Sequence, residues 1–252
     1  MTNRRYQRAA PAAPPDPALV ESSAEDVRRR LRQAGRRDAA ERLRREVGRD
    51  VPCYGVPSAE VYRIGLDLVR RLRAAGLPAT LAIADNLFRT GNVEEGLVGA
   101  QIVGALARLI TGDDFQRIEP WGDTLTAPQT ADALGASCLS PSLAAKPSLV
   151  KTMREWARSS NPSKRRAAVS AFGPLVREGR FTSDALEVAE IVMLDDSEEV
   201  QRGVGTMLME ATRLRADRVV EFLMEWRDQS PRLVLQTAAT KLPPAERGRV
   251  LG

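Results

Sequence analysis

Apolar residues recur at helical spacing along most of the chain. Val27, Leu31 and Ala34 fall at positions i, i+4 and i+7, and the stretch 61–72 repeats the same pattern. No segment alternates apolar and polar residues with a period of two, so the pattern predicts no β-sheet. We therefore predict an all-α protein of about ten to twelve helices joined by short links.

Residues with a preference for helix ends separate these apolar stripes. Asn92, with Glu95 three residues later, forms a capping-box pattern, and Asn161 stands directly before Pro162. Gly35 and Gly48 follow the first two predicted helices, where glycine ends a helix at low steric cost. These signals place the predicted helix boundaries independently of the apolar stripes.

The C-terminal part has a repeating organisation. Predicted helices near 163–177 and 183–194 are followed by helices near 198–214 and 217–228. This offset of roughly 35 residues is in the range of two-helix solenoid repeats. The predicted architecture is a HEAT-like helical-repeat superhelix, an α-solenoid of the armadillo-like kind, with a concave binding face.

The N-terminal stretch has a different composition. Residues 1–22 are rich in proline, alanine and arginine and carry few large apolar side chains. Such a segment buries too little apolar surface to offset the entropy of ordering. We predict a disordered leader over residues 1–22 and a single helical-repeat domain over residues 23–252.

Composition excludes several classes of function. The sequence has no histidine, and Cys53 and Cys138 are its only cysteines, so Ser-His-Asp catalysis and a four-ligand zinc site are both excluded. A phosphate-binding GxxxxGK[ST] loop is also missing. We expect no metal and no cofactor, and acid-base chemistry would fall to carboxylates, lysine, tyrosine or water. The sequence contains no secretory signal and no apolar run of membrane-spanning length, so we expect a cytoplasmic protein.

The positive net charge is confined to one part of the chain. Residues 1–50 carry 13 Arg against 8 Asp and Glu, which accounts for the whole formal net charge of +5. The other 202 residues are balanced, at 25 positive and 25 negative side chains. A phosphate-binding surface there would need segregation of charge along one face.

The segment EPWGDTL, residues 119–125, raises the question of catalysis. Trp121 stands two residues before Asp123 at a predicted helix start, in a chain with three tryptophans. One interpretation is a catalytic carboxylate beside a stacking ring. The other is a buried indole beneath a helix whose first-turn amides are satisfied by Asp123. Trp156 and Trp226 lie on apolar stripes and are predicted to be core residues.

Several segments, taken in order, resemble a known family. RLRREVGRDVPCYGVPSAEVYRIG resembles the early segment of the DNA alkylation repair family, the AlkD-like alkylpurine DNA glycosylases. LPATLAIADNLFRTGNVEEGLVGAQIVGAL keeps the helix, short polar link and long apolar helix of that family. MREWARSSNPSKRRAAVSAF is similar to its Trp, polar turn and double Arg, and EEVQRGVGTMLMEATRLRADRVVEFLMEW to its late helix pair. The resemblance covers residues 24–245.

The resemblance implies a HEAT-like superhelix whose concave face binds duplex DNA and removes N3- or N7-alkylated purines. Members use two tryptophans and an aspartate, with a Trp-Asp-x-x-Asp motif. If Trp121 is the family tryptophan, the catalytic position falls on Leu125; if Asp123 is the first Asp, it falls on Thr126. The second tryptophan position reads Thr206. Both replacements remove groups that stabilise a cationic purine and an oxocarbenium-like transition state.

The same resemblance supplies candidate DNA contacts. Lys164, Arg165 and Arg166 open a helix where the family's double Arg faces the DNA backbone, and Arg202 could extend that stripe. The alternative is a solvated basic turn. Tyr54, beside Gly55, could stack on a nucleotide or plug the first repeat.

Two functional hypotheses follow from the sequence. The first is a monomeric protein that binds damaged duplex DNA and has a role in alkylation repair, with glycosylase activity left open and Trp121 and Asp123 as catalytic candidates. The second is a non-catalytic helical scaffold that binds a protein partner in its groove. The two differ in whether the basic side chains or the carboxylates of Asp195, Asp196, Glu198 and Glu199 dominate the groove.

Overall fold

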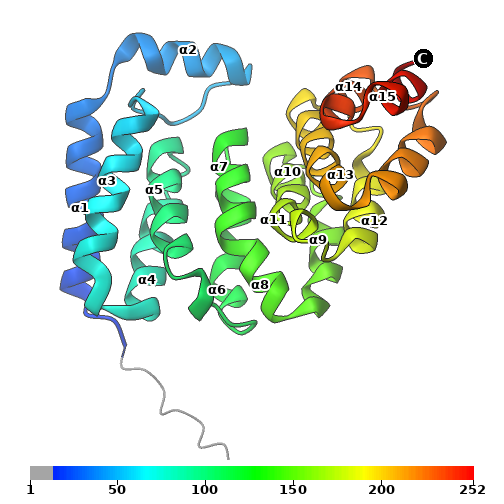
Figure 1. Ribbon diagram of the computed structural model, residues 1–252. Helices are drawn as coiled ribbons and strands as arrows, with labels where there is room; N and C mark the ends of the chain where they lie inside the picture. The colour runs from blue at the N-terminus through cyan, green and yellow to red at the C-terminus, as the bar shows by residue number, and fades with distance from the viewer. Residues whose placement is uncertain (1–13) are drawn as a thin grey trace, which may run out of the picture.

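The computed structural model describes residues 14–252, and this part of the chain consists of helices and the links between them (Figure 1). The α-helices are α1 (Pro17–Ala34), α2 (Arg37–Val47), α3 (Ser58–Arg71), α4 (Gly76–Phe88), α5 (Val93–Gly104), α6 (Phe115–Ile118), α7 (Pro128–Leu134), α8 (Ser140–Ala145), α9 (Val150–Trp156), α10 (Pro162–Ser170), α11 (Gly173–Arg177), α12 (Thr182–Val192), α13 (Glu198–Trp226), α14 (Arg232–Ala238) and α15 (Pro244–Leu251). The predicted all-α class is confirmed.

Shorter helical segments connect several of these elements. They are the 3₁₀ helices η1 (Leu72–Ala74), η2 (Ala107–Leu109), η3 (Glu119–Thr124), η5 (Pro147–Leu149) and η6 (Ala239–Lys241), and the π-helix η4 (Gly135–Leu139). Helix α13 contains a kink at Arg215, whose φ of −137° and ψ of 45° are not helical. This kink falls between the predicted helices 198–214 and 217–228. Two helices were expected there, and the chain bends without a separate link.

The first helix begins earlier than the sequence pattern indicates. Helix α1 starts at Pro17, so residues 17–22 are helical and the prediction of a disordered leader is wrong for them. Asp16 caps the helix by accepting a hydrogen bond from the Ala18 amide at 2.9 Å, and Pro17 suits the first helical position. The proline that suggested a leader is therefore part of a helix start. Residues 1–13 of the predicted leader lie outside the described residues.

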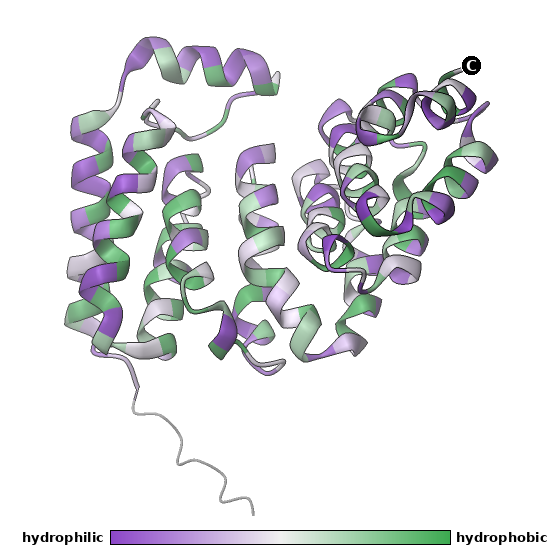
Figure 2. Cartoon of the chain, in the orientation of Figure 1, coloured by the Kyte–Doolittle hydropathy of each residue, from purple (hydrophilic) through white to green (hydrophobic). Residues whose placement is uncertain are grey.

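The helices form two layers, and the chain runs through them from the left to the right of Figure 1. One layer, which we call the front layer, contains α3, α5, α7, α10 and the first half of α13, each packed against the next. Helices α1, α4, α9 and α12 form the second layer and pack against α3, α5, α10 and α13 respectively, and α6 contacts α4. Helix α2 lies across the ends of α3 and α5 and is largely hydrophilic (Figure 2).

Several polar contacts between neighbouring units join residues 33 to 36 positions apart in sequence. Trp121 bonds Asp85 at a separation of 36 residues, Thr126 bonds Gly91 at 35, and Arg166 bonds Asp132 at 34. Arg177 bonds Glu210 at a separation of 33. The offset of roughly 35 residues that was inferred from the C-terminal sequence is thus also the sequence separation between contacting residues of neighbouring units, from Asp85 to Glu210.

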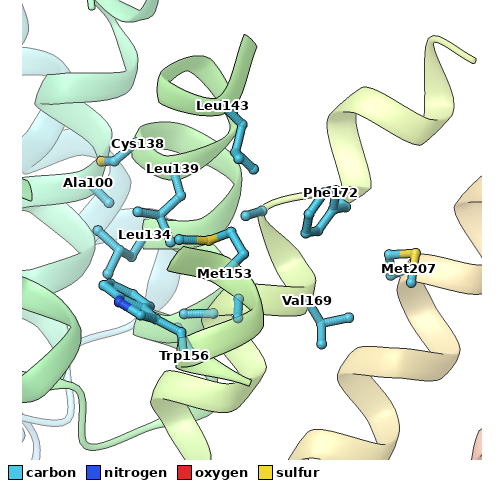
Figure 3. Packing of buried hydrophobic residues seen from close by; sticks show 14 of the residues in the cluster. Ala100, Leu134, Cys138, Leu139, Leu143, Met153, Trp156, Val169, Phe172 and Met207 are labelled. Carbon is cyan, nitrogen blue, oxygen red and sulfur yellow. The ribbon is translucent and has the colours of Figure 1, made fainter. Parts of the chain in front are cut away.

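One continuous apolar core runs between the two layers. Leu134, Met153, Trp156 and Phe172 pack together in its middle (Figure 3), and each is at most 3% exposed. Trp156 is a core residue as predicted, whereas Trp226 is half-buried and packs against the edge of the core. Burial of this kind contributes most of the favourable free energy of folding.

The link between α2 and α3 is tied to the N-terminal ends of the front-layer helices. The buried carboxylate of Glu94, in the first turn of α5, accepts bonds from the amides of Tyr54, Gly55 and Val56 at 3.0, 2.7 and 3.1 Å. The guanidinium of Arg49 bonds the Thr126 carbonyl at 2.9 Å and also contacts Ser163 and Glu199. The Pro52 carbonyl of this link in turn accepts a hydrogen bond at 2.9 Å from the amide of Val93, the first residue of α5, which would otherwise be free.

Candidate functional site

Trp121 and Asp123 point to different partners and do not form one site. Trp121 is 1% exposed, its ring stacks on Phe88 with a centroid separation of 4.7 Å, and its Nε1 donates to Asp85 Oδ1 at 3.1 Å. The Asp123 side chain is 72% exposed and accepts from Lys164 Nζ at 2.5 Å. Trp121 is thus a buried indole. The prediction that an α-helix starts here is wrong, because both residues lie in the 3₁₀ helix η3 and the next α-helix, α7, begins at Pro128.

The alternative motif registers also lack a carboxylate. Leu125 is buried, and the Thr126 hydroxyl donates to the Gly91 carbonyl at 2.8 Å. Asp123 bonds Lys164, so the predicted satisfaction of first-turn amides by this residue is not observed either. The EPWGDTL segment is therefore a packing and ion-pair element between α4, α9 and α10.

Each of the four predicted phosphate-contacting cations is bound to a carboxylate. Besides the Lys164–Asp123 pair, Arg165 Nε donates to Asp195 at 2.6 Å, and Arg166 Nη2 donates to Asp132 at 2.6 Å. Arg202, 56% exposed, pairs with Glu198 at 2.7 Å. Lys164 also lies 4.8 Å from the centroid of the Trp156 ring. Lys164, Arg165 and Arg166 link separate segments of the fold, whereas the Arg202–Glu198 pair lies within α13.

Tyr54 occupies the first repeat as a packing residue. Its hydroxyl donates to Glu95 Oε1 at 2.7 Å, and Arg28 bonds the other oxygen of the same carboxylate at 2.9 Å. Burial, together with the hydrogen bond to Glu95, raises the pKa of Tyr54 above its ordinary value. Of the two interpretations of Tyr54, this arrangement matches a side chain that fills the first repeat and not one that stacks on a nucleotide.

The front layer contains two adjoining cavities that share Ala136, and we call the surface that joins them the groove. The first cavity, of about 690 Å³, lies between α3, α5, α7 and η4. Its lining includes Tyr62, Gln101, Gln129, Ala133 and Ser137, and no residue that lines it in the described part of the chain is charged. Volumes of this size are typical of ligand sites.

The second cavity, of about 210 Å³, lies between α7, α10, α11 and α13 and contains charged side chains. Asp132 projects from α7 with 46% of its side chain exposed, and its carboxylate accepts from Arg166 and from the Ser170 hydroxyl at 2.6 Å. Thr206 lines the same cavity. The predicted position of the second family tryptophan therefore lines the same cavity as Asp132.

Glu210 is the other carboxylate of the second cavity. It accepts hydrogen bonds from Arg177 at 2.7 Å and Lys241 at 3.0 Å, and its side chain is 15% exposed. Burial opposes its ionisation, but the bonds from Lys241 and Arg177 outweigh that effect and lower the pKa of Glu210. Asp132 is therefore the more accessible carboxylate of the two.

Comparison with known proteins identifies the family. A family model described as DNA alkylation repair enzyme matches residues 27–242. The chain belongs to the DNA alkylation repair family. A predicted DNA alkylation repair enzyme from Enterococcus faecalis has a similar fold, with a TM-score of 0.69 and 11% identity over 83% of this chain and 97% of that one. No curated protein matches the sequence.

Two further findings describe what this family member contains. Within residues 14–252, no helix is long and apolar enough to cross a bilayer. The described residues also contain no group of three or more Cys, Asp or Glu side chains arranged to hold a metal ion.

The residues that line the groove were not among those predicted from the sequence. Asp132 is the one charged residue in the segment 124–145, and Tyr62 is an aromatic residue beside the stripe that begins at Val61. Both departures from the helical pattern were available as signals. Gln101 and Gln129 gave no comparable signal, because glutamine is an ordinary residue on an exposed helix face.

Proposed function

We propose that this family member binds DNA along the groove, with the carboxylate of Asp132 facing the sugar of an alkylated purine. The observation that carries the proposal is the position of Asp132: it is accessible, and Arg166 and Ser170 fix its orientation. An alkylated purine is cationic, and its glycosidic bond breaks through an oxocarbenium-like state that a fixed carboxylate stabilises. Asp123, 72% exposed and bound to Lys164, has no such position.

The electrostatics of the groove limit how DNA is held. Arg166 already balances the charge of Asp132, and the other three predicted phosphate-contacting cations are ion-paired as well. The logarithm of the binding constant for DNA falls linearly with the logarithm of the salt concentration. The slope is about −0.9 for each phosphate that the protein neutralises. We therefore expect a shallow salt dependence.

The test measures two quantities on the same proteins. Release of free 7-methylguanine from methylated duplex DNA is compared for the wild type, Asp132→Asn and the matched control Asp123→Asn. Fluorescence anisotropy with a salt titration gives DNA binding for each. We expect Asp132→Asn to slow base release by roughly 10²-fold or more, since it removes a charge that stabilises the transition state. Asp123→Asn is expected to leave release unchanged.

Other results would change the conclusion in defined ways. Base release that survives Asp132→Asn and disappears in Asp123→Asn would return the carboxylate role to Asp123. DNA binding without base release in the wild type would mean that the groove has kept recognition and lost catalysis.

A second candidate function is a scaffold that binds a protein in the groove. The observation that favours it is the pairing of Lys164, Arg165 and Arg202 with acidic partners, which leaves little free positive charge for phosphates. A wild-type protein that binds neither methylated nor unmodified DNA at low salt would support this function.

A further inference from the structure

The first cavity differs from the second in its chemistry. Its lining is uncharged within the described residues and combines small side chains with two amides, whereas the second cavity contains Asp132, Arg177 and Glu210. Phosphates and cationic purines gain little from an uncharged surface. The first cavity suits a neutral, planar group with donors and acceptors on its edge.

Tyr62 supplies an aromatic surface at this cavity. It is 59% exposed, although it lies in a helix whose neighbouring residues Val61 and Ile64 are buried. Exposed aromatic rings beside a groove are platforms on which nucleic-acid bases stack, independently of base identity. The ring of Tyr62 is thus available to a ligand.

Gln101 is held at the cavity by a close fit to α3. Its Nε2 donates to the Tyr62 carbonyl at 3.0 Å, and its amide lies across Gly65. A Cβ atom at Gly65 would be 2.0 Å from Oε1 and 2.4 Å from Cδ of Gln101. Gly65 therefore leaves room for the amide, and Gln129 adds a second amide to the lining. Amides present both donors and acceptors, as base edges do.

We propose that the first cavity receives an unstacked, uncharged nucleobase, which stacks on Tyr62 while Gln101 and Gln129 hydrogen-bond its edge. This inference rests on the proposed binding of DNA in the groove. Because the two cavities share Ala136, a base in the first cavity would be close to a nucleotide at Asp132. The groove would then select DNA in which one base is already unpaired, because unstacking that base costs least.

The experiment compares two duplexes of the same sequence, one fully paired and one with a single extrahelical base. Affinities are measured by anisotropy at constant salt. The wild type is expected to bind the bulged duplex about tenfold more tightly, which is the order expected for stacking of one base. Tyr62→Ala is expected to abolish this preference, measured as the ratio of its affinities for the two duplexes. Tyr62→Phe, which keeps the ring, is expected to retain the preference.

Two further variants separate positioning from loss of structure. Gly65→Ala adds a Cβ that displaces the Gln101 amide and favours the helix, so it is expected to fold and to reduce the preference severalfold. Leu194→Ala removes an exposed apolar side chain outside both cavities and is expected to change nothing. The thermal unfolding midpoint of each variant is measured to test whether its fold is intact.

The outcomes distinguish this inference from the proposed function. Equal wild-type affinity for the two duplexes, or a preference that persists in Tyr62→Ala, overturns the nucleobase site and leaves DNA binding in place. Absence of binding to either duplex overturns the proposed function and the inference together.

Discussion

The segment around Trp121 and the groove around Asp132 differ in how far their characteristic side chains are exposed. Trp121 is stacked on Phe88 and almost fully buried, while Asp132 projects into a cavity with nearly half of its side chain exposed. The tryptophan and aspartate that are adjacent in sequence serve packing and an ion pair. The carboxylate that faces the groove comes from the next helix. Proximity in sequence is thus a poor guide to a site that adjacent repeats assemble.

The largest expected effect tests whether the Trp121 segment is structural. Trp121→Ala removes a buried ring and its hydrogen bond to Asp85, so we expect the free energy of unfolding to fall by about 3–5 kcal/mol. Urea denaturation followed by circular dichroism measures this change. A loss below about 1 kcal/mol would contradict the packing role, because such losses are typical of exposed positions.

A smaller effect on stability is expected when one methyl group is added to the tightly packed Trp121 segment and, for comparison, to the open second cavity. Gly122→Ala places a Cβ 2.3 Å from Cη2 of Trp156, so we expect destabilisation of about 1–3 kcal/mol. Gly173 lines the second cavity, and a Cβ added there would meet open space, with nothing packed within 4 Å of it. Gly173→Ala is the matched control, expected to change stability by about 0.5 kcal/mol or less. Equal losses in the two variants would mean that the cavity is as closely packed as the core.

The ion pairs of the groove give a dependence of stability on pH. The pKa of Glu210 is lower in the folded protein than its ordinary value of 4.5, so its contribution to stability is fully present above that value. It is lost as the pH falls through the folded pKa. We expect Glu210→Gln to cost on the order of 1 kcal/mol near pH 7 and less as the pH falls below 4.5.

Chemical denaturation of the wild type and Glu210→Gln across this pH range measures the difference. A difference that stays constant with pH would show that Arg177 and Lys241 stabilise the cavity without depending on the charge of Glu210.

The smallest expected effect concerns Asp123. Its exposed carboxylate pairs with Lys164, so Asp123→Asn is expected to change the free energy of unfolding by about 0–1 kcal/mol. Raising the salt concentration should reduce the difference further, because exposed pairs are screened. A cost well above this range would assign Asp123 a structural role that its exposure does not indicate.

Much of the fold was predictable because it depends on local rules. Asn92 and Asn161 cap the helices that the sequence placed after them, and Gly48 ends α2 with a φ of 73°. The start of α1 was not predicted, because the Pro-rich composition around it obscures the Asp16 cap. The site was predicted poorly, because Lys164 and Arg165 show their charge in the sequence but not their partners.

The sequence by itself determined the helical class, the spacing of about 35 residues between units and the resemblance to the DNA alkylation repair family, since helical periodicity and helix caps act over a few residues. Tertiary structure alone decided which side of each helix faces the groove. Asp132 meets Arg166 from 34 residues away, and Arg165 meets Asp195 from 30 residues away. These pairings depend on how helices rotate and pack against their neighbours, which no local pattern specifies.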